Sequence, residues 1–520
     1  MSADSNAGLA ASAVEPLRCG CAHRSSAATR TAPWRHSSLL SLSACLLSLC
    51  SPSSFAIERP LDATVPSAVH GSASSAHAPQ NLPQLASTVV RSEGLQWIDA
   101  ERPAERAALL DFTTHIEWLP HPDWDLHLGL RLYAERQHGS ERSNDWEASG
   151  DYDESFVRYR TAKQRITLGA QRVRWGQMDY RPPTNRLAAH DRRHFPVGDR
   201  SEQLPIPALR WEHFGDHIDT EWLWLPYFRA ARLPEADDPW YPVDQHRGLV
   251  AGIDLDPALA PWLGIATIID DTPSGSGGAG LRLRGSTPQI DYALSAQRAR
   301  RSMPYYELGP EVPPHLRTAL TRGELPQQLR EAIDEEGAAA LWERIAGSGT
   351  PLTVRARYPY ATIFGGDLAW TWRDTVWRAE AAWLSDVPAT TAQLDYTTVP
   401  GFEWAVAFET FPFESEVRLI VQLSGDHRLD DRALLDPAHA YTVSGGLERY
   451  WQRQRWRTRL RYLLGYEPRQ RYLNPQVAYL GRDAQEFFAE VHWFDGARHT
   501  PIGYYRHHDL VLLGWRIHYH

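Results

Sequence analysis

Apolar and polar side chains alternate along most of this chain, and the alternation limits the folds that it can adopt. In the last run, one face of an extended strand would carry Leu513, Trp515, Ile517 and Tyr519, and the other Gly514, Arg516, His518 and His520. A membrane-spanning strand needs an apolar, aromatic-tipped face toward lipid and a polar face toward a wet interior. A strand of a soluble sheet also alternates, so the argument depends on recurrence.

The pattern recurs, and several runs come in pairs. Residues 110–118 and 124–132 are separated by a short turn and predict a hairpin, as do residues 368–372 and 377–383 around the Arg373-Asp374 turn. Further alternating runs occupy residues 290–296, 402–408, 417–423 and 455–464. We therefore predict an all-β fold, a transmembrane antiparallel up-and-down β-barrel. The length allows about 14 to 18 strands, at about ten residues per strand plus turns and loops.

The run from Arg455 to Leu464 carries one arginine at every second position. The arginines are Arg455, Arg457, Arg459 and Arg461, and the opposite face carries Trp456, Thr458, Leu460, Tyr462 and Leu464. Four arginines on one face cannot lie in a dry core, but they can line a water-filled channel. They are candidate pore-lining residues that would give anions a local path. The alternative is that they pair with acidic residues of neighbouring strands.

The N-terminus resembles an export signal. Arg30 and Arg35 precede the apolar run 39–50, and Ser54-Phe55-Ala56 has the small residues of a cleavage site. We predict a signal peptide over residues 1–56, cleavage after Ala56 and location in the Gram-negative outer membrane. A lipoprotein signal at Cys45 is the alternative. All four cysteines lie in this leader, so the sequence predicts no disulfide and no thiol chemistry in the mature chain.

Two parts follow the leader, and the second contains an insertion. Residues 57–105 are rich in Ala, Ser, Pro and His and predict a flexible periplasmic segment. Residues 106–520 predict the barrel, interrupted at 304–350 by a helical loop insertion. Its helix-spaced apolar residues are Leu325, Leu329, Ile333, Leu341, Trp342 and Ile345. This insertion would cap the extracellular mouth, enter the lumen as a plug, or form an ordinary surface loop.

A dense cluster of charges follows the strand that begins at Ile166. The candidate site residues here are Arg172, Arg174, Asp179, Arg181, Asn185, Asp191, Arg192 and Arg193. This segment cannot stay in lipid, so we expect it to fold into the lumen or the periplasmic mouth. There its charges would narrow the pore, as charged constrictions do in other channels. The alternative is a structural ion-pair cluster that fixes an inward loop and contacts no solute.

The same segment carries a resemblance to a known family. Its motifs are Leu168-Gly169, Arg174-Trp175-Gly176, Asp179, Pro183-Thr184-Asn185, Leu187 and Asp191, and a second block comprises 222–226, 232–234 and 238–240. They resemble the signature of an uncharacterised family of Gram-negative outer-membrane barrels, a domain of unknown function. The resemblance implies a porin-like barrel and an RND-type envelope transporter as a partner. The chain departs from the family pattern at Ala188-Ala189-His190, where a proline commonly precedes the Asp.

We therefore predict an outer-membrane channel that passes small solutes or serves an envelope export system. Its expected partners are outer-membrane lipid and, through the C-terminal strand, the barrel-assembly machinery. One alternative is a barrel enzyme acting on lipid or surface polymer, which would need a nucleophile and a base within hydrogen-bond reach. Another is a soluble periplasmic β-rich binding protein. The net charge of −10 argues against nucleic acid as a partner. We predict no enzymatic activity, metal or cofactor.

Overall fold

The computed structural model describes residues 82–140, 145–194, 203–236, 238–245, 247–252, 260–313, 317, 327–347, 349–412 and 416–519. The predicted leader, its cleavage site after Ala56, residues 57–81 and His520 lie outside these ranges.

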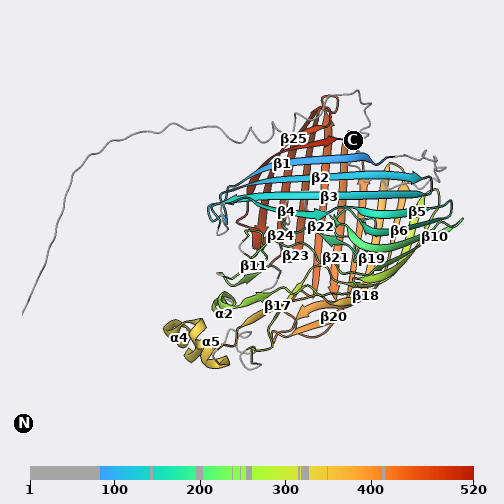
Figure 1. Ribbon diagram of the computed structural model, residues 1–520. Helices are drawn as coiled ribbons and strands as arrows, with labels where there is room; N and C mark the ends of the chain where they lie inside the picture. The colour runs from blue at the N-terminus through green and yellow to red at the C-terminus, as the bar shows by residue number, and fades with distance from the viewer. Residues whose placement is uncertain are drawn as a thin grey trace, which may run out of the picture. The chain divides into compact units, whose positions relative to one another are not determined.

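Antiparallel strands join edge to edge in a closed barrel (Figure 1). The first strand, β1, pairs with β2 on one side and with β26 on the other, which closes the wall. β4 and β5 pair with different parts of β3 and together fill one position, so the wall has 18 strand positions. The wall strands are β1 (Gln84–Trp97), β2 (Arg106–His121), β3 (Trp124–His138), β4 (Glu147–Tyr152), β5 (Ser155–Arg160), β6 (Gln164–Gln171), β9 (Ile206–His213), β10 (Ile218–Leu225), β14 (Gly278–Ser286), β15 (Ile290–Arg300), β18 (Tyr360–Trp372), β19 (Thr375–Thr390), β20 (Tyr396–Thr410), β21 (Val417–Arg428), β22 (His439–Trp451), β23 (Trp456–Glu467), β24 (Gln470–Arg482), β25 (Gln485–Gly496) and β26 (Leu510–Tyr519).

The closed barrel confirms the predicted fold class and excludes a soluble propeller or sandwich. Both predicted hairpins are present, as β2–β3 and as β18–β19 around the Arg373-Asp374 turn. The predicted start of the barrel at residue 106 is wrong, because β1 lies within 57–105 and is a wall strand. The prediction failed because the lipid-facing positions of β1 include Ser92, Gly94 and Gln96, which break the apolar alternation.

The outer face of the wall is apolar. Every second residue of β3, from Trp124 to Ala134, points outward, and Leu128 on this face is 62% exposed. Aromatic side chains form cross-strand pairs near the tight turns, including Trp124–Tyr159, Trp370–Trp377 and Trp456–Tyr479. A band of exposed apolar side chains bordered by aromatic rings is what a barrel presents to lipid and headgroups. The protein is therefore an outer-membrane β-barrel.

The two ends of the barrel differ in their connections. The tight turns 122–123, 373–374 and 483–484 lie at one end, whereas the long connections 172–205, 226–277, 301–359 and 497–509 lie at the other. Outer-membrane barrels have short periplasmic turns and long extracellular loops. The start of β1 is at the periplasmic end, since Gln84 pairs with Glu117 beside the 122–123 turn.

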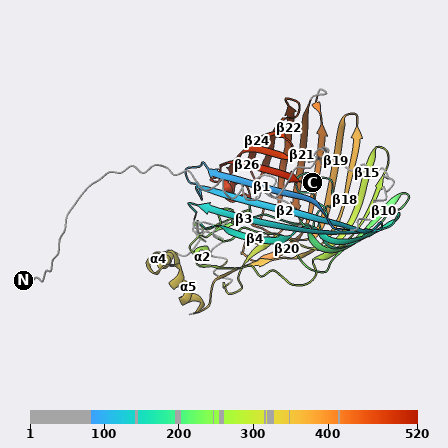
Figure 2. The ribbon, with the colours of Figure 1, turned by 45° about the horizontal axis from the view of Figure 1, so that its top comes forward.

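The long extracellular connections build a small lobe. It contains α2 (Ala260–Ile265), α4 (Gln327–Glu336), α5 (Ala338–Ala346) and a sheet of β13 (Thr267–Ile269), β16 (Tyr305–Leu308) and β17 (Thr353–Arg357), while β11 (Val243–Asp244) and β12 (Leu249–Val250) pair separately. Leu341 and Trp342 are buried in its apolar core, and Trp342 packs edge-on against Trp262. Figures 1 and 2 show α4 and α5 beyond the ends of the strands, so these two helices of the predicted insertion lie outside the lumen. Leu325 lies outside the described residues. Among the described helices, none has the length and apolar character that crossing a membrane requires.

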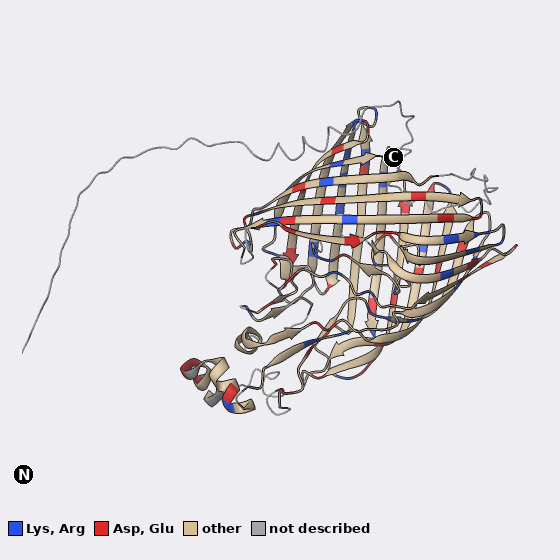
Figure 3. Ribbon diagram, viewed as in Figure 1, with Lys and Arg blue, Asp and Glu red and all other residues tan. Residues whose placement is uncertain are grey.

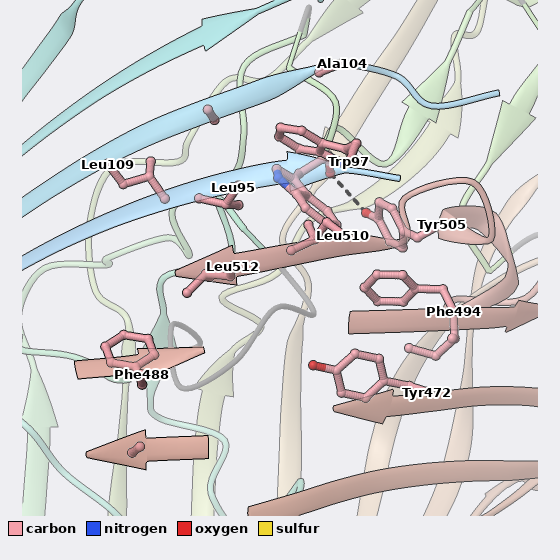
Figure 4. Close-up of a cluster of buried hydrophobic side chains, with 14 residues drawn as sticks. Leu95, Trp97, Ala104, Leu109, Tyr472, Phe488, Phe494, Tyr505, Leu510 and Leu512 are labelled. Carbon is pink, nitrogen blue, oxygen red and sulfur yellow. Dashed lines mark hydrogen bonds between the residues drawn. The ribbon is translucent and has the colours of Figure 1, made fainter. Parts of the chain in front are cut away.

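A second apolar core lies inside the wall at the extracellular end. Leu95 and Trp97 of β1 meet Phe494, Tyr505 and Leu510, as Figure 4 shows. Tyr505 belongs to η5 (Gly503–Tyr505), and its hydroxyl donates to the carbonyl of Trp240 at 3.0 Å. Trp240 comes from the connection after β10, and this cluster therefore holds that connection inside the barrel.

Candidate constriction site

The chain leaves the wall after β6 and enters the lumen. We call residues 172–194 the inward loop; its β7 (Ala189–His190) pairs with β8 (Gln203–Leu204) just before β9. Apolar residues of this loop and of its return segment pack against the inner wall. They are Val173, Trp175, Leu187, Ala189 and Leu204, in contact with a set that includes Leu223, Ala299, Ile363 and Leu384. One side of the lumen is thus filled by a dry core, and the charged residues of the loop face the rest of the wall.

Glu380 on β19 is the main polar anchor of the inward loop. Its carboxylate accepts hydrogen bonds from the backbone nitrogens of Gln177 at 3.0 Å and Thr184 at 2.7 Å, and from the Thr184 hydroxyl at 2.6 Å. The side chain is almost fully buried. Gly176, with φ of +87°, approaches so closely that an added Cβ would lie 2.5 Å from a Glu380 oxygen. This position therefore requires glycine.

Further hydrogen bonds fix the loop along its length. The Trp175 indole donates to Glu221 on β10 at 2.9 Å, and the Trp175 backbone nitrogen donates to Asn185 at 3.2 Å. The Gln177 amide donates to Asp367 on β18 at 2.9 Å. The motif residues Trp175, Gly176, Thr184 and Asn185 thus share one structural role, which is to hold the loop across the lumen.

Several predicted site residues form ion pairs with the wall. Asp179 accepts from Arg378 of β19 at 3.3 Å, and Arg181 lies 3.1 Å from Asp426 of β21. Arg172 lies 2.5 Å from Asp153, while Arg174 donates to the carbonyl of Met178 at 2.8 Å. The structure thus brings Asp179 and Arg181 of the loop together with charged residues of the wall.

The end of the inward loop forms a mixed-charge cluster against β1–β3. Asp191 pairs with Arg193 at 2.6 Å and lies 3.7 Å from Arg131 of β3, and the Arg193 guanidinium lies 4.0 Å from the Tyr133 ring centre. These residues line a cavity of about 20 Å³, the size of one water, together with Arg91, Glu93, Leu109, Asp111 and His194. Burial opposes ionisation of Asp191, but Arg193 and Arg131 outweigh it and lower its pKa to about 2. Arg192 stands beside this cluster, with its backbone nitrogen bonded to Arg232.

The arginine row lies on the inner face of β23, where its side chains reach β25. Arg457 contacts Glu486 at 2.5 Å, and Arg461 lies 3.3 Å from Glu490, both on β25. The pairing alternative is therefore present at both residues. Arg459 occupies the inward position between them. The prediction that Arg455 lines the pore is wrong, because β23 begins at Trp456 and Arg455 is an exposed residue of the tight turn before it. Figure 3 shows charges of both signs along the strands.

The connection after β10 meets the inward loop beside two carboxylates, those of Glu135 and Asp238. The Gln137 side chain of β3 donates to Glu135 at 2.8 Å and to Asp238 at 2.7 Å, and it therefore bridges the two carboxylates. His194 of the inward loop lies 3.5 Å from Glu135. Burial, with the Glu135 charge, raises the pKa of Asp238 to about 6.

This raised pKa predicts pH-dependent docking of the connection. The folded pKa of Asp238 exceeds the ordinary value of 3.8, so the docked form holds a proton that the undocked form releases. Docking should therefore strengthen as the pH falls from 7.5 to 5, by about 1 kcal/mol. Hydrogen exchange of residues 238–241, corrected for the intrinsic pH effect, measures it. Asp238→Asn should abolish the dependence; an unchanged dependence would assign it to another group.

One arrangement resembles what an enzyme would need. The Ser87 hydroxyl lies 3.1 Å from Nδ1 of His115, and Nε2 of His115 lies 3.4 Å from Asp153. Nε2 makes no hydrogen bond among the described residues, and Asp153 is already paired with Arg172. The three side chains face the lumen, whereas a lipid substrate would meet the outer face. This geometry does not favour the enzyme alternative.

Comparisons with solved structures concern the barrel as a whole. OccD3 (OpdP) of Pseudomonas aeruginosa is similar with a TM-score of 0.45 and 8% identity, over 85% of this chain and 92% of that chain. OccAB4 of Acinetobacter baumannii gives 0.44 and 6%, over 85% and 98%. OmpF of Salmonella typhi, solved as a complex with daunomycin, gives 0.38 and 9%, over 84% and 97%. No family model and no curated protein matches. The chain is thus similar to porin-like barrels in fold alone.

The sequence did not single out the wall residues that hold the loop. Glu221, Asp367, Glu380 and Gln422, which accepts a hydrogen bond from the backbone nitrogen of Tyr180 at 3.2 Å, are all buried and inward-facing. The sequence does indicate that each of them faces the lumen, because each is a polar residue on the face opposite the apolar one. The sequence could not indicate which of many such residues would meet the loop, since this depends on strand register.

Proposed function

We propose that the protein is a passive channel whose passage lies between the inward loop and the wall formed by β22–β26. The observation that carries this proposal is the inward loop itself, a charged segment tied across the lumen through Glu380. On one side of the loop the dry core fills the lumen. The opposite wall carries polar and charged inward residues, including Arg459 and Arg461 of β23.

The charges around this passage suit small polar or ionic solutes. Arginines pair with carboxylates in the cluster at Asp191 and between β23 and β25, so a solute would cross a transverse field between paired charges. Membership of the uncharacterised family, and service to an RND-type transporter, stay predictions of the sequence resemblance.

Neutralising the loop arginines tests the proposal. Arg192→Gln with Arg193→Gln removes two positive charges from the lumen, so single-channel conductance should change and the reversal potential in asymmetric KCl should shift toward cation preference. Planar-bilayer recording measures both quantities.

A matched control is available outside the lumen. Arg432 pairs with Asp430 at 2.9 Å. The two residues have the same separation in sequence as Arg193 and Asp191, but they lie in an exposed extracellular connection. Arg432→Gln should leave both quantities unchanged. Currents that are identical in the wild type and the Arg192/Arg193 variant would reject the loop as the constriction.

A further inference from the structure

The outer face of the barrel carries an open hollow near the extracellular end of β10, β14, β15 and β18. Its volume is about 380 Å³, and it is lined by Trp224, Ser276, Gly278, Ala279, Arg298 and Tyr360. In the register of the wall, Ala279 lies between Trp224 and Arg298, and Arg298 is opposite Thr362. The hollow is therefore a feature of four adjacent strands and faces away from the lumen.

Arg298 marks the edge of the lipid-facing band. The outward positions of β15 are Ile290, Tyr292, Leu294, Ala296, Arg298 and Arg300, in order from the periplasmic to the extracellular end. Leu294 is 65% exposed. The change from apolar residues to two arginines sets the level at which hydrocarbon gives way to the headgroups of the outer leaflet. Trp224, which is half exposed, stands at the same level.

The two arginines are held by aromatic rings and neutral oxygens. Arg298 donates to the Thr362 hydroxyl at 2.9 Å. The Arg300 guanidinium lies 4.4 Å from the Tyr360 ring centre and 5.4 Å from that of Phe228, and its buried Nε makes no hydrogen bond among the described residues. These contacts orient both guanidinium groups but supply no negative charge.

Neither guanidinium forms an ion pair within the described part of the chain. Arg282, on the inner face of the adjacent strand β14, lies by contrast 2.8 Å from Asp367. Two carboxylates of neighbouring segments accept hydrogen bonds from hydroxyls instead, Asp270 from Tyr358 and Asp386 from Thr398. Two adjacent cations at the border of a low-dielectric phase call for an anion from outside the protein.

We propose that Arg298 and Arg300 bind the phosphate of an anionic lipid of the outer leaflet, with its acyl chains along Trp224 and the apolar face of β15. Guanidinium groups match phosphate oxygens in charge and geometry. The hollow of about 380 Å³ opens beside Arg298, and the Tyr360 ring lies against both guanidinium groups. This lipid site is independent of the channel function, since its residues do not face the lumen.

Native mass spectrometry of the full barrel in an uncharged detergent tests the site. The probes are lipid A and the same lipid after removal of its phosphates. We expect lipid A to bind about tenfold more tightly than the dephosphorylated lipid, and Arg298→Gln with Arg300→Gln to remove that preference. Lysine at both positions should retain part of it. A heat-shifted band on a gel verifies that each variant is folded, and the two-lipid comparison on the wild type stands even if a variant does not fold.

The control is an arginine that also lies over an aromatic ring, but at the periplasmic end of the barrel. Arg373, in a periplasmic turn, lies 4.8 Å from the Trp372 ring centre, and Arg373→Gln should leave lipid A binding unchanged. Equal affinity for the two lipids, or an equal loss in the Arg373 variant, would overturn the proposal. Displacement of lipid A by inorganic phosphate at equal concentration would identify a free-phosphate site and would also overturn it.

Discussion

Replacing Glu380 with alanine should release the inward loop and raise the single-channel conductance several-fold. The substitution leaves the backbone nitrogens of Gln177 and Thr184 without their acceptor in a buried site. Each such orphan group costs about 1–3 kcal/mol, so the loop would lose about 3–5 kcal/mol of anchoring in total. β19 keeps its backbone pairing with β18 and β20, and we therefore expect a mobile loop in a folded barrel. Planar-bilayer recording measures the conductance, and a heat-shifted gel band reports the fold.

Glu212 provides a matched control for this experiment. It is a buried, inward-facing glutamate of β9 that lies 3.1 Å from Arg210, and its ion pairs are with other wall residues. Glu212→Ala also removes a buried carboxylate, so its stability should fall, but the inward loop keeps its anchors. Conductance near the wild-type value is expected. A similar rise in both variants would show that general loosening of the barrel, and not release of the loop, enlarges the passage.

A chain that begins at residue 98 should fail to form a heat-modifiable barrel, whereas a chain that begins at residue 82 should form one. The shorter chain lacks β1, which pairs with β26 from Thr88–Tyr519 to Trp97–Leu510 and with β2 along its other edge. Without β1, both β2 and β26 present unpaired backbone groups to lipid, where each costs several kcal/mol. It also lacks Leu95 and Trp97, which belong to the apolar core at the extracellular end.

Refolding both chains in detergent and comparing boiled with unboiled samples on a gel measures this difference. Trp97→Ala in the longer chain serves as the control, because it disturbs the core but keeps the strand. This variant should still give a heat-shifted band, at a lower unfolding temperature. A heat-shifted band from the chain that begins at residue 98 would mean that β2 and β26 can close the wall without β1.

The membrane-facing part of the fold was predictable because lipid imposes one simple rule on every second residue. The hairpin of β2 and β3 follows that rule, with Leu110, Leu128 and Leu130 exposed on the outer face. β1 follows it only in part, because Ser92 and Gly94 are outward-facing. Its inner face, with Leu95 and Trp97, is the apolar one near the extracellular end. Alternation therefore predicts a membrane strand only where the outward residues are apolar and the inward residues are polar.

The inward loop was predictable in kind, but its contacts were not. A dense run of charges beside prolines cannot face lipid, and this excluded a wall strand for residues such as Asp179 and Asp191. Their partners depend on which wall residues lie opposite, and Thr184 and Glu380 are 196 positions apart in the chain. Local sequence also could not separate Arg455, in a turn, from Arg457, in the strand, because a strand boundary depends on where its partner ends.

The pairing of Thr88 with Tyr519 brings the first and last strands together at the periplasmic end. A short linker would therefore join residue 82 to residue 519, and a new start could be made at the Arg373-Asp374 turn without changing any neighbour in the wall. Circular permutants of this kind succeed where the cut lies in an exposed connection. Each position of the wall thus has a neighbour on both sides although the polypeptide has two ends, so the pairing of the strands does not depend on where the chain begins.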